Sequence, residues 1–185
     1  LNGETYEFPI IEGSEQEKAI DISKLRTQTG YITLDYGFKN TGSTQSAITY
    51  LDGENGILRY RGYSIEELAE NASFIEVAYL LIYGDLPNAE QLKYFQEGIT
   101  HHTLVHENMK RFFEAFPPGA HPMGMLSSMI SSLSTFYPES QNPNRSVVDI
   151  ELTIHRLIAK LPTLAAQAYK HNMGHPTVYP SNKLS

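Results

Sequence analysis

Cysteine is absent from this 185-residue sequence, and long apolar runs and an excess of positive charge are absent as well. Without cysteine the chain can form no disulfide, thiolate nucleophile, cysteine-ligated zinc site or iron–sulfur cluster, and such a composition is typical of a reducing compartment. No apolar run reaches the roughly 18 to 20 residues that cross a bilayer, and the N-terminus lacks the basic and apolar segments of a signal peptide. We therefore expect a cytoplasmic protein with no membrane partner.

Lysine and arginine together number 14, against 21 aspartate and glutamate residues, which gives a net charge of −7. A chain this acidic is a poor match for a nucleic-acid backbone, so we expect no nucleic-acid partner. Hydrophobic residues make up 41% of the chain, enough for a sizeable core in one domain or in a large piece of one. The chain starts at Leu1 rather than Met and stops at Ser185 soon after a proline-rich turn, so we expect a fragment.

Residues 1–62 combine short β-prone stretches with turn formers. Residues 5–11 and 31–36 are predicted to be short strands, because β-branched and aromatic residues stand there between glycines. Apolar residues at helical spacing predict at most a short helix within residues 15–25. Residues 46–60 predict a β-hairpin, since Asp-Gly and Asn-Gly supply the positive φ that such turns require. We expect 1–62 to be one region of strands and hairpin.

From residue 63 onward the helical signals dominate. Ser64, Ser73, Asn88 and Ser146 stand where an N-cap side chain accepts from the free N–H groups of a helix start. Helical spacing then predicts further helices over 74–83, 89–104, 107–116, 123–137 and 147–169. The first of these is apolar nearly all round, which predicts burial on most faces. The fold class is therefore mainly α, with 63–185 as the helical part of one structural unit.

Motifs that carry chemistry are scarce. His102 and His106 lie four apart on a predicted helix and could share a metal ion, but there is no clear third ligand, and hydrogen-bonded or exposed histidines explain them more simply. Neither a Gly-x-Ser-x-Gly elbow nor a glycine-rich phosphate loop is present. Arg156 and Lys160 lie four apart on the longest predicted helix, where two cations could hold a phosphate or a carboxylate; solvated surface charges are the alternative. We predict no metal site.

Several stretches resemble the N-terminal part of citrate synthase, specifically its longer bacterial type. They are His121-Pro122-Met123 and three longer segments: ITYLDGENGILRYRG over 48–62, THHTLVHE over 100–107, and KLPTLAAQAYKHNMGHPTVYP over 160–180. The resemblance spans nearly the whole chain. It implies the early part of a large, multi-helical domain, with short N-terminal strands and a hairpin.

The resemblance also implies an activity for the full-length protein. The family condenses acetyl-CoA with oxaloacetate to give citrate and CoA, a step of the tricarboxylic acid cycle that needs a placed base and an electrophile aimed at the developing oxygen charge. In the family these groups come from an Asp, two His and several Arg, one His lying in a G-P-x-H-G-G segment that this sequence lacks. We therefore assign no catalytic residue here and expect the fragment to be inactive. No cofactor is required, and a homo-oligomer, either a dimer or a hexamer, is implied.

One regulatory site of the family does match positions in this chain. Many Gram-negative members are inhibited by NADH at a site remote from the active site, and the residues resembling its lining are His102, Thr103, Leu104, Tyr137, Arg156 and Lys160. The resemblance gives the two cations to the phosphates and the His-Thr segment to the adenosine end. His101 and Leu104 stand where NADH-sensitive members carry Arg and Met, so the alternative is a site that keeps its geometry without regulating anything.

Two other functions stay open at this stage. The same architecture serves 2-methylcitrate synthase, and the matching segments do not separate the two acyl-CoA substrates. The piece could also be a regulatory or assembly module that binds a nucleotide, NADH included, or a second copy of itself without performing chemistry.

Overall fold

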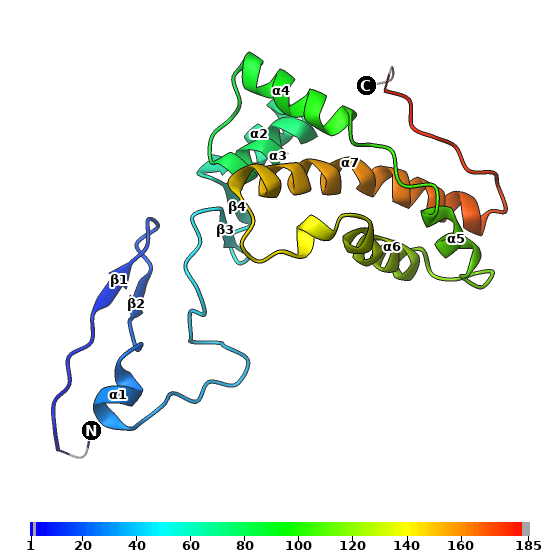
Figure 1. Cartoon of the computed structure of the whole chain (residues 1–185). Coiled ribbons are helices and arrows are strands. Elements are labelled where there is room, and N and C mark those ends of the chain that lie inside the picture. Colours follow the sequence, from blue (N-terminus) through cyan, green and yellow to red (C-terminus); the bar gives the residue numbers. More distant parts are fainter. Residues whose placement is uncertain (2, 183–185) are drawn as a thin grey trace.

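The computed structural model describes residue 1 and residues 3–182 and consists mainly of helices (Figure 1). An N-terminal arm carries β1 (Ile10–Glu12), β2 (Lys18–Ile20) and α1 (Leu25–Thr29), and it extends away from the helices in Figure 1. A small sheet follows, with β3 (Thr49–Asp52), β4 (Ile57–Tyr60) and β5 (Tyr63–Ser64). The remaining elements are α2 (Ile65–Asn71), α3 (Phe74–Tyr83), α4 (Ala89–Thr100), α5 (Met109–Glu114), α6 (Pro122–Phe136), the 3-10 helix η1 (Pro138–Gln141) and α7 (Val147–Asn172). The predicted fold class, mainly α, is confirmed.

The N-terminal arm differs from the sequence prediction. The strand expected over 5–11 is present only as β1, which pairs antiparallel with β2. The helix expected within 15–25 is wrong, because backbone pairing with β1 takes Lys18–Ile20 into a strand and α1 begins only at Leu25. Residues 31–36 form no strand, since no neighbouring strand pairs with them, and the apolar side chains of this stretch are exposed.

The hairpin over 46–60 is confirmed. β3 and β4 pair antiparallel with Asp52 opposite Ile57, and β5 adds a third strand beyond β4. The Asp52 carboxylate closes the turn by accepting hydrogen bonds from the backbone N–H groups of Glu54 and Asn55. Gly56, in the Asn-Gly pair, has the positive φ of 67° that the prediction required.

The predicted caps begin the predicted helices. Ser73 and Ser146 form reciprocal capping boxes with the residue three positions on, whereas at Ser64 the side chain accepts from the backbone N–H of Glu67 and no capping box is formed. Asn88 also forms such a box, with Gln91. The four capped helix starts are therefore confirmed. The predicted bounds between the next two helices are wrong, because α4 ends at Thr100 and the uncapped α5 starts at Met109, which leaves 101–108 as a loop.

The core lies where α5 and α6 pack on the C-terminal half of α7. Its buried members are Met109, Phe113, Met125, Met129, Leu133, Leu164 and Ala168. A second cluster joins α3, α4 and α7 around Phe95, which is fully buried and contacts the rings of Tyr79 and His155 edge-on. The prediction that α3 is buried on most faces is wrong, because only Leu80 of this helix is fully buried and Phe74 is 76% exposed. Among the described residues, no helix is long and apolar enough to span a membrane.

Candidate functional site

The α4–α5 loop, residues 101–108, is attached to α7 through its backbone. The Lys160 ammonium donates hydrogen bonds to the carbonyl oxygen of His102, at 2.6 Å, and to that of Leu104. The Thr163 hydroxyl donates to the carbonyl of Thr103 at 2.9 Å. Side chains of α7 thus take up three consecutive carbonyls of the loop, which explains why α4 does not continue through these residues.

Tyr137, at the end of α6, meets the two predicted cations on α7. The Arg156 guanidinium lies 4.3 Å from the centre of its ring, and the Lys160 ammonium 5.5 Å from it. Arg156 also forms an ion pair with Glu139 of η1. The prediction that Arg156 and Lys160 share one side of the helix is confirmed. We call Tyr137, Glu139, Arg156 and Lys160 the cation cluster.

Lys160 is the buried cation of the cation cluster. Lys160 is only 2% exposed, and burial, together with the charge of Arg156, lowers its pKa to about 8. Burial also lowers the pKa of His102, with smaller contributions from Lys160 and Arg156. Within the described part of the chain, no ion pair involves Lys160, so its charge is met only by carbonyl dipoles and the tyrosine ring. Such a site favours an anionic ligand.

The six predicted site residues therefore come together, but their side chains point to different surroundings. His102 lines a groove between α4 and α7, the Thr103 hydroxyl lies 3.1 Å from the side-chain oxygen of Asn182, and the Leu104 side chain is 51% exposed. The loop is thus joined to the cation cluster through the backbone carbonyls of His102 and Leu104, which accept from Lys160. Lys160 is buried and donates two of its three N–H groups to carbonyls, whereas the Arg156 side chain is 20% exposed and is paired with Glu139, so Arg156 is the cation that a ligand can reach.

The groove beside His102 was missed by sequence reasoning. It has a volume of about 320 Å³, and its lining includes Gly98 of α4 and Glu151 of α7. His155 also lines it; this residue is 5% exposed, its Nε2 has no partner among the described residues, and burial lowers its pKa. No motif marked His155, because it lies among the apolar residues of a helix, where a histidine is not distinguished by spacing.

His102 and His106, the two histidines considered as metal ligands, lie in separate surroundings. His102 and His106 do not share a helix face, because α4 ends before both of them. The His106 ring packs on Phe136 at 5.0 Å between ring centres, and its Nδ1 accepts from the backbone N–H of Asn108. Across residues 1 and 3–182, no group of three or more metal-ligating side chains is found.

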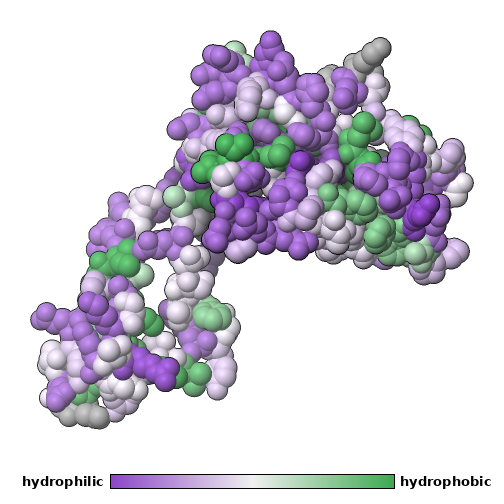
Figure 2. Space-filling model, viewed as in Figure 1, coloured by the Kyte–Doolittle hydropathy of each residue, from purple (hydrophilic) through white to green (hydrophobic). Residues whose placement is uncertain are grey.

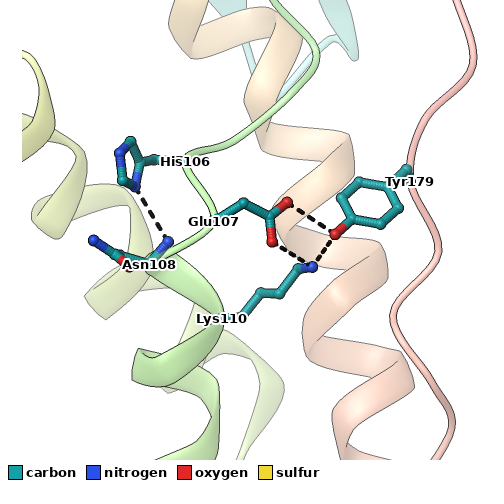
Figure 3. A network of polar contacts seen from close by, with 5 residues as sticks. All are labelled: His106, Glu107, Asn108, Lys110 and Tyr179. Carbon is teal, nitrogen blue, oxygen red and sulfur yellow. Dashed lines mark hydrogen bonds and ion pairs between the residues drawn. The ribbon is translucent and has the colours of Figure 1, made fainter.

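A C-terminal segment, residues 175–182, crosses beside the loop, and we call it the strap. Tyr179 donates a hydrogen bond to Glu107 at 2.8 Å and accepts one from Lys110, which itself forms an ion pair with Glu107 at 2.7 Å (Figure 3). Further along, Asn182 lies against Thr103. The strap thus contacts the loop that lies over Lys160.

Comparison with known proteins identifies the family. Residues 37–185 match the family model described as "Citrate synthase, C-terminal domain". The chain is 48% identical, over 99% of its length, to "Citrate synthase 1" of Mycobacterium tuberculosis and covers 42% of that protein. The chain belongs to the citrate synthase family.

Solved structures agree with this assignment. The citrate synthase of Thermotoga maritima matches with a TM-score of 0.68 and 27% identity over 83% of this chain and 39% of that one. The citrate synthase of Pyrobaculum aerophilum matches with a TM-score of 0.71 and 25% identity over 98% of this chain and 44% of that one. The chain therefore spans less than half the length of the citrate synthases it matches. Within it, the family model begins at residue 37 and leaves out most of the N-terminal arm.

Proposed function

We propose that the whole protein is a citrate synthase, an acyltransferase that joins acetyl-CoA to oxaloacetate and releases citrate and CoA in the tricarboxylic acid cycle. The observation that carries this proposal is the 48% identity to a citrate synthase over 99% of the chain. The reaction forms a carbon–carbon bond from a weak carbon acid, and one water molecule then hydrolyses the thioester. It therefore needs a base, a polarising group for each carbonyl, and a site that keeps water from the thioester until the carbon–carbon bond has formed.

In this proposal residues 1–185 are scaffold, and polypeptide outside them supplies the reacting groups. Two histidines already have structural surroundings: His106 packs on Phe136, and His121 caps α6 by accepting from the backbone N–H of Met123. These surroundings support a structural role, because a histidine that polarises a substrate needs a ring nitrogen aimed into an open site.

Turnover of the full-length protein tests the reaction. We expect oxaloacetate-dependent release of free CoA from acetyl-CoA, and much slower release from propionyl-CoA. Faster turnover with propionyl-CoA would instead identify a 2-methylcitrate synthase. Residues 1–185 alone should cleave neither thioester, and activity from this piece would contradict the scaffold role.

We also propose that the cation cluster and the α4–α5 loop form a regulatory site for NADH. Support comes from three sets of contacts in a region that favours anions. Lys160 donates to the carbonyls of His102 and Leu104, Thr163 donates to the carbonyl of Thr103, and Arg156 lies over the ring of Tyr137. The test is NADH inhibition of the full-length enzyme. We expect Arg156→Ala to weaken inhibition and to leave turnover without NADH unchanged, whereas an unaltered inhibition curve would remove Arg156 from the site.

Self-association and location complete the proposal. We propose that the protein is cytoplasmic and forms a homo-oligomer, either a dimer or a hexamer. Self-association is supported by large apolar side chains that stay exposed on the helices, among them Phe74, Val147 and Val148 at 76%, 80% and 72%. The visible face is otherwise largely hydrophilic, with apolar patches between (Figure 2). Light scattering of the full-length protein would give the oligomer size, and a monomer would contradict this part.

A further inference from the structure

Glu139 forms an ion pair with Arg156, the cation of the regulatory site that is available to a ligand. Its carboxylate forms an ion pair with the Arg156 guanidinium, although the two residues are 17 positions apart and belong to η1 and α7. The same guanidinium lies 4.3 Å from the centre of the Tyr137 ring. Arg156 is therefore placed by the ring and neutralised by the carboxylate.

The carboxylate is held in its charged form. Hydrogen bonds from the backbone N–H of Glu139 itself and from Arg156 lower the pKa of Glu139. A charged carboxylate presents oxygen acceptors to a guanidinium much as a phosphate does, since both groups suit its planar array of N–H donors. Glu139 is in this respect a substitute, built into the chain, for an anionic ligand.

The two partners differ in how firmly they are held. The Arg156 side chain is 20% exposed and packs on Tyr137, whereas the Glu139 side chain is 44% exposed. Lys160, the other cation, is already bonded to the carbonyls of His102 and Leu104. An incoming phosphate can therefore reach Arg156 most easily by displacing the Glu139 carboxylate into solvent.

We propose that Glu139 competes with the phosphate groups of a ligand for the Arg156 guanidinium and so sets the affinity of the regulatory site. The inference rests on the proposed regulatory function, because it assumes that a phosphate-bearing ligand binds at Arg156. It predicts that removing the charge of Glu139, and with it the ion pair to Arg156, strengthens the binding of a phosphate-bearing ligand.

The test compares binding of inorganic pyrophosphate and of NADH to the full-length protein, measured by calorimetry. Glu139→Gln keeps the shape of the side chain and removes its charge. We expect it to bind both probes about two- to fivefold more tightly, the range that an exposed ion pair accounts for. Glu114→Gln removes one exposed negative charge from α5 instead and should bind as the unmodified protein does. In an Arg156→Ala background, Glu139→Gln should give no gain.

The outcomes separate the two proposals. If Arg156→Ala weakens binding but Glu139→Gln leaves it unchanged or weaker, the competition is wrong and the regulatory site stands. A gain in both Glu139→Gln and Glu114→Gln would reveal a general charge effect and also overturn the competition. If the unmodified protein and Glu139→Gln both bind neither probe, the regulatory site fails and the competition fails with it.

Discussion

Gly98 on α4 occupies a position where a side chain has no room. A Cβ at this residue would lie 2.8 Å from Nδ1 and 2.9 Å from Cε1 of His155, closer than non-bonded atoms approach. His155 cannot easily yield, because it is 5% exposed and packed against Phe95. The absence of a side chain at one helix residue thus allows α4 and α7 to approach each other beside the groove.

We predict that Gly98→Ala destabilises the protein by about 1 to 3 kcal/mol, because overpacking outweighs the gain of up to about 1 kcal/mol in helix propensity. Gly124→Ala in α6 is the matched control, since a Cβ there would have no neighbour within 4 Å. Urea denaturation of both variants measures the difference. Equal effects of the two substitutions would show that His155 moves aside.

Lys160 is the residue whose protonation we expect to affect stability. Its pKa falls to about 8 in the folded protein from an ordinary value of 10.5. Between these values the unfolded chain binds more protons than the folded chain, so the contribution of this residue to stability rises with pH across that window.

The prediction is that the unmodified protein gains stability relative to Lys160→Met as the pH is raised from 8 to 10. Urea unfolding at several pH values measures this difference, and comparison with the variant cancels the titration of other groups. A difference that stays constant over this range would show that Lys160 keeps its ordinary pKa in the folded state.

At the scale of elements, α7 organises the helical part. It packs against α4 with its N-terminal half and against α5 and α6 with its C-terminal half (Figure 1). Its start is fixed by Ser146, whose side chain accepts from the backbone N–H of Asp149, while the Asp149 side chain accepts from that of Ser146. A substitution that weakens this cap should therefore weaken the packing of α7 against α4 and against α5 and α6.

We predict that Ser146→Ala lowers the free energy of unfolding by about 1 kcal/mol, the usual contribution of an N-cap side chain. Ser134→Ala is the control, because the Ser134 hydroxyl donates to the carbonyl of Ser131 within its own helix and caps no helix start. Thermal unfolding followed by circular dichroism compares the two variants. No loss at Ser146 would mean that packing alone fixes the start of α7.

For the whole molecule, the strap joins parts of the chain that are far apart in sequence. Tyr179 bonds to Glu107, 72 residues earlier, and its ring lies 4.3 Å from the Lys110 ammonium. Beneath the strap, a largely apolar groove of about 410 Å³ is lined by residues including Pro162 and Val178. The strap is therefore held at a few polar points rather than by continuous packing.

Tyr179→Phe should release the strap locally. We predict that amide hydrogen exchange becomes about two- to tenfold faster in residues 103–110 and in the strap, since one hydrogen-bonded hydroxyl contributes about 1 kcal/mol. Tyr169→Phe, an exposed ring on α7, is the control. Unchanged exchange in the first variant would mean that the ring contact with Lys110 holds the strap without the hydroxyl.

The sequence by itself determined the starts of the capped helices, the hairpin and the family. Caps at Ser73, Asn88 and Ser146 and the turn at Gly56 depend on residues only a few positions apart, so local chemistry is sufficient to predict them. The pairing of Arg156 with Lys160 on one side of α7 follows from helical periodicity for the same reason.

Only the tertiary structure decided what these residues touch. It ended α4 early, because Lys160 and Thr163 take up carbonyls of a loop about 60 residues earlier in the chain. It placed Glu139 on Arg156 and His155 on Gly98, and it drew residues 18–20 into a strand by pairing them with β1. Each of these outcomes depends on contacts between distant segments, whose energies no local pattern of residues contains.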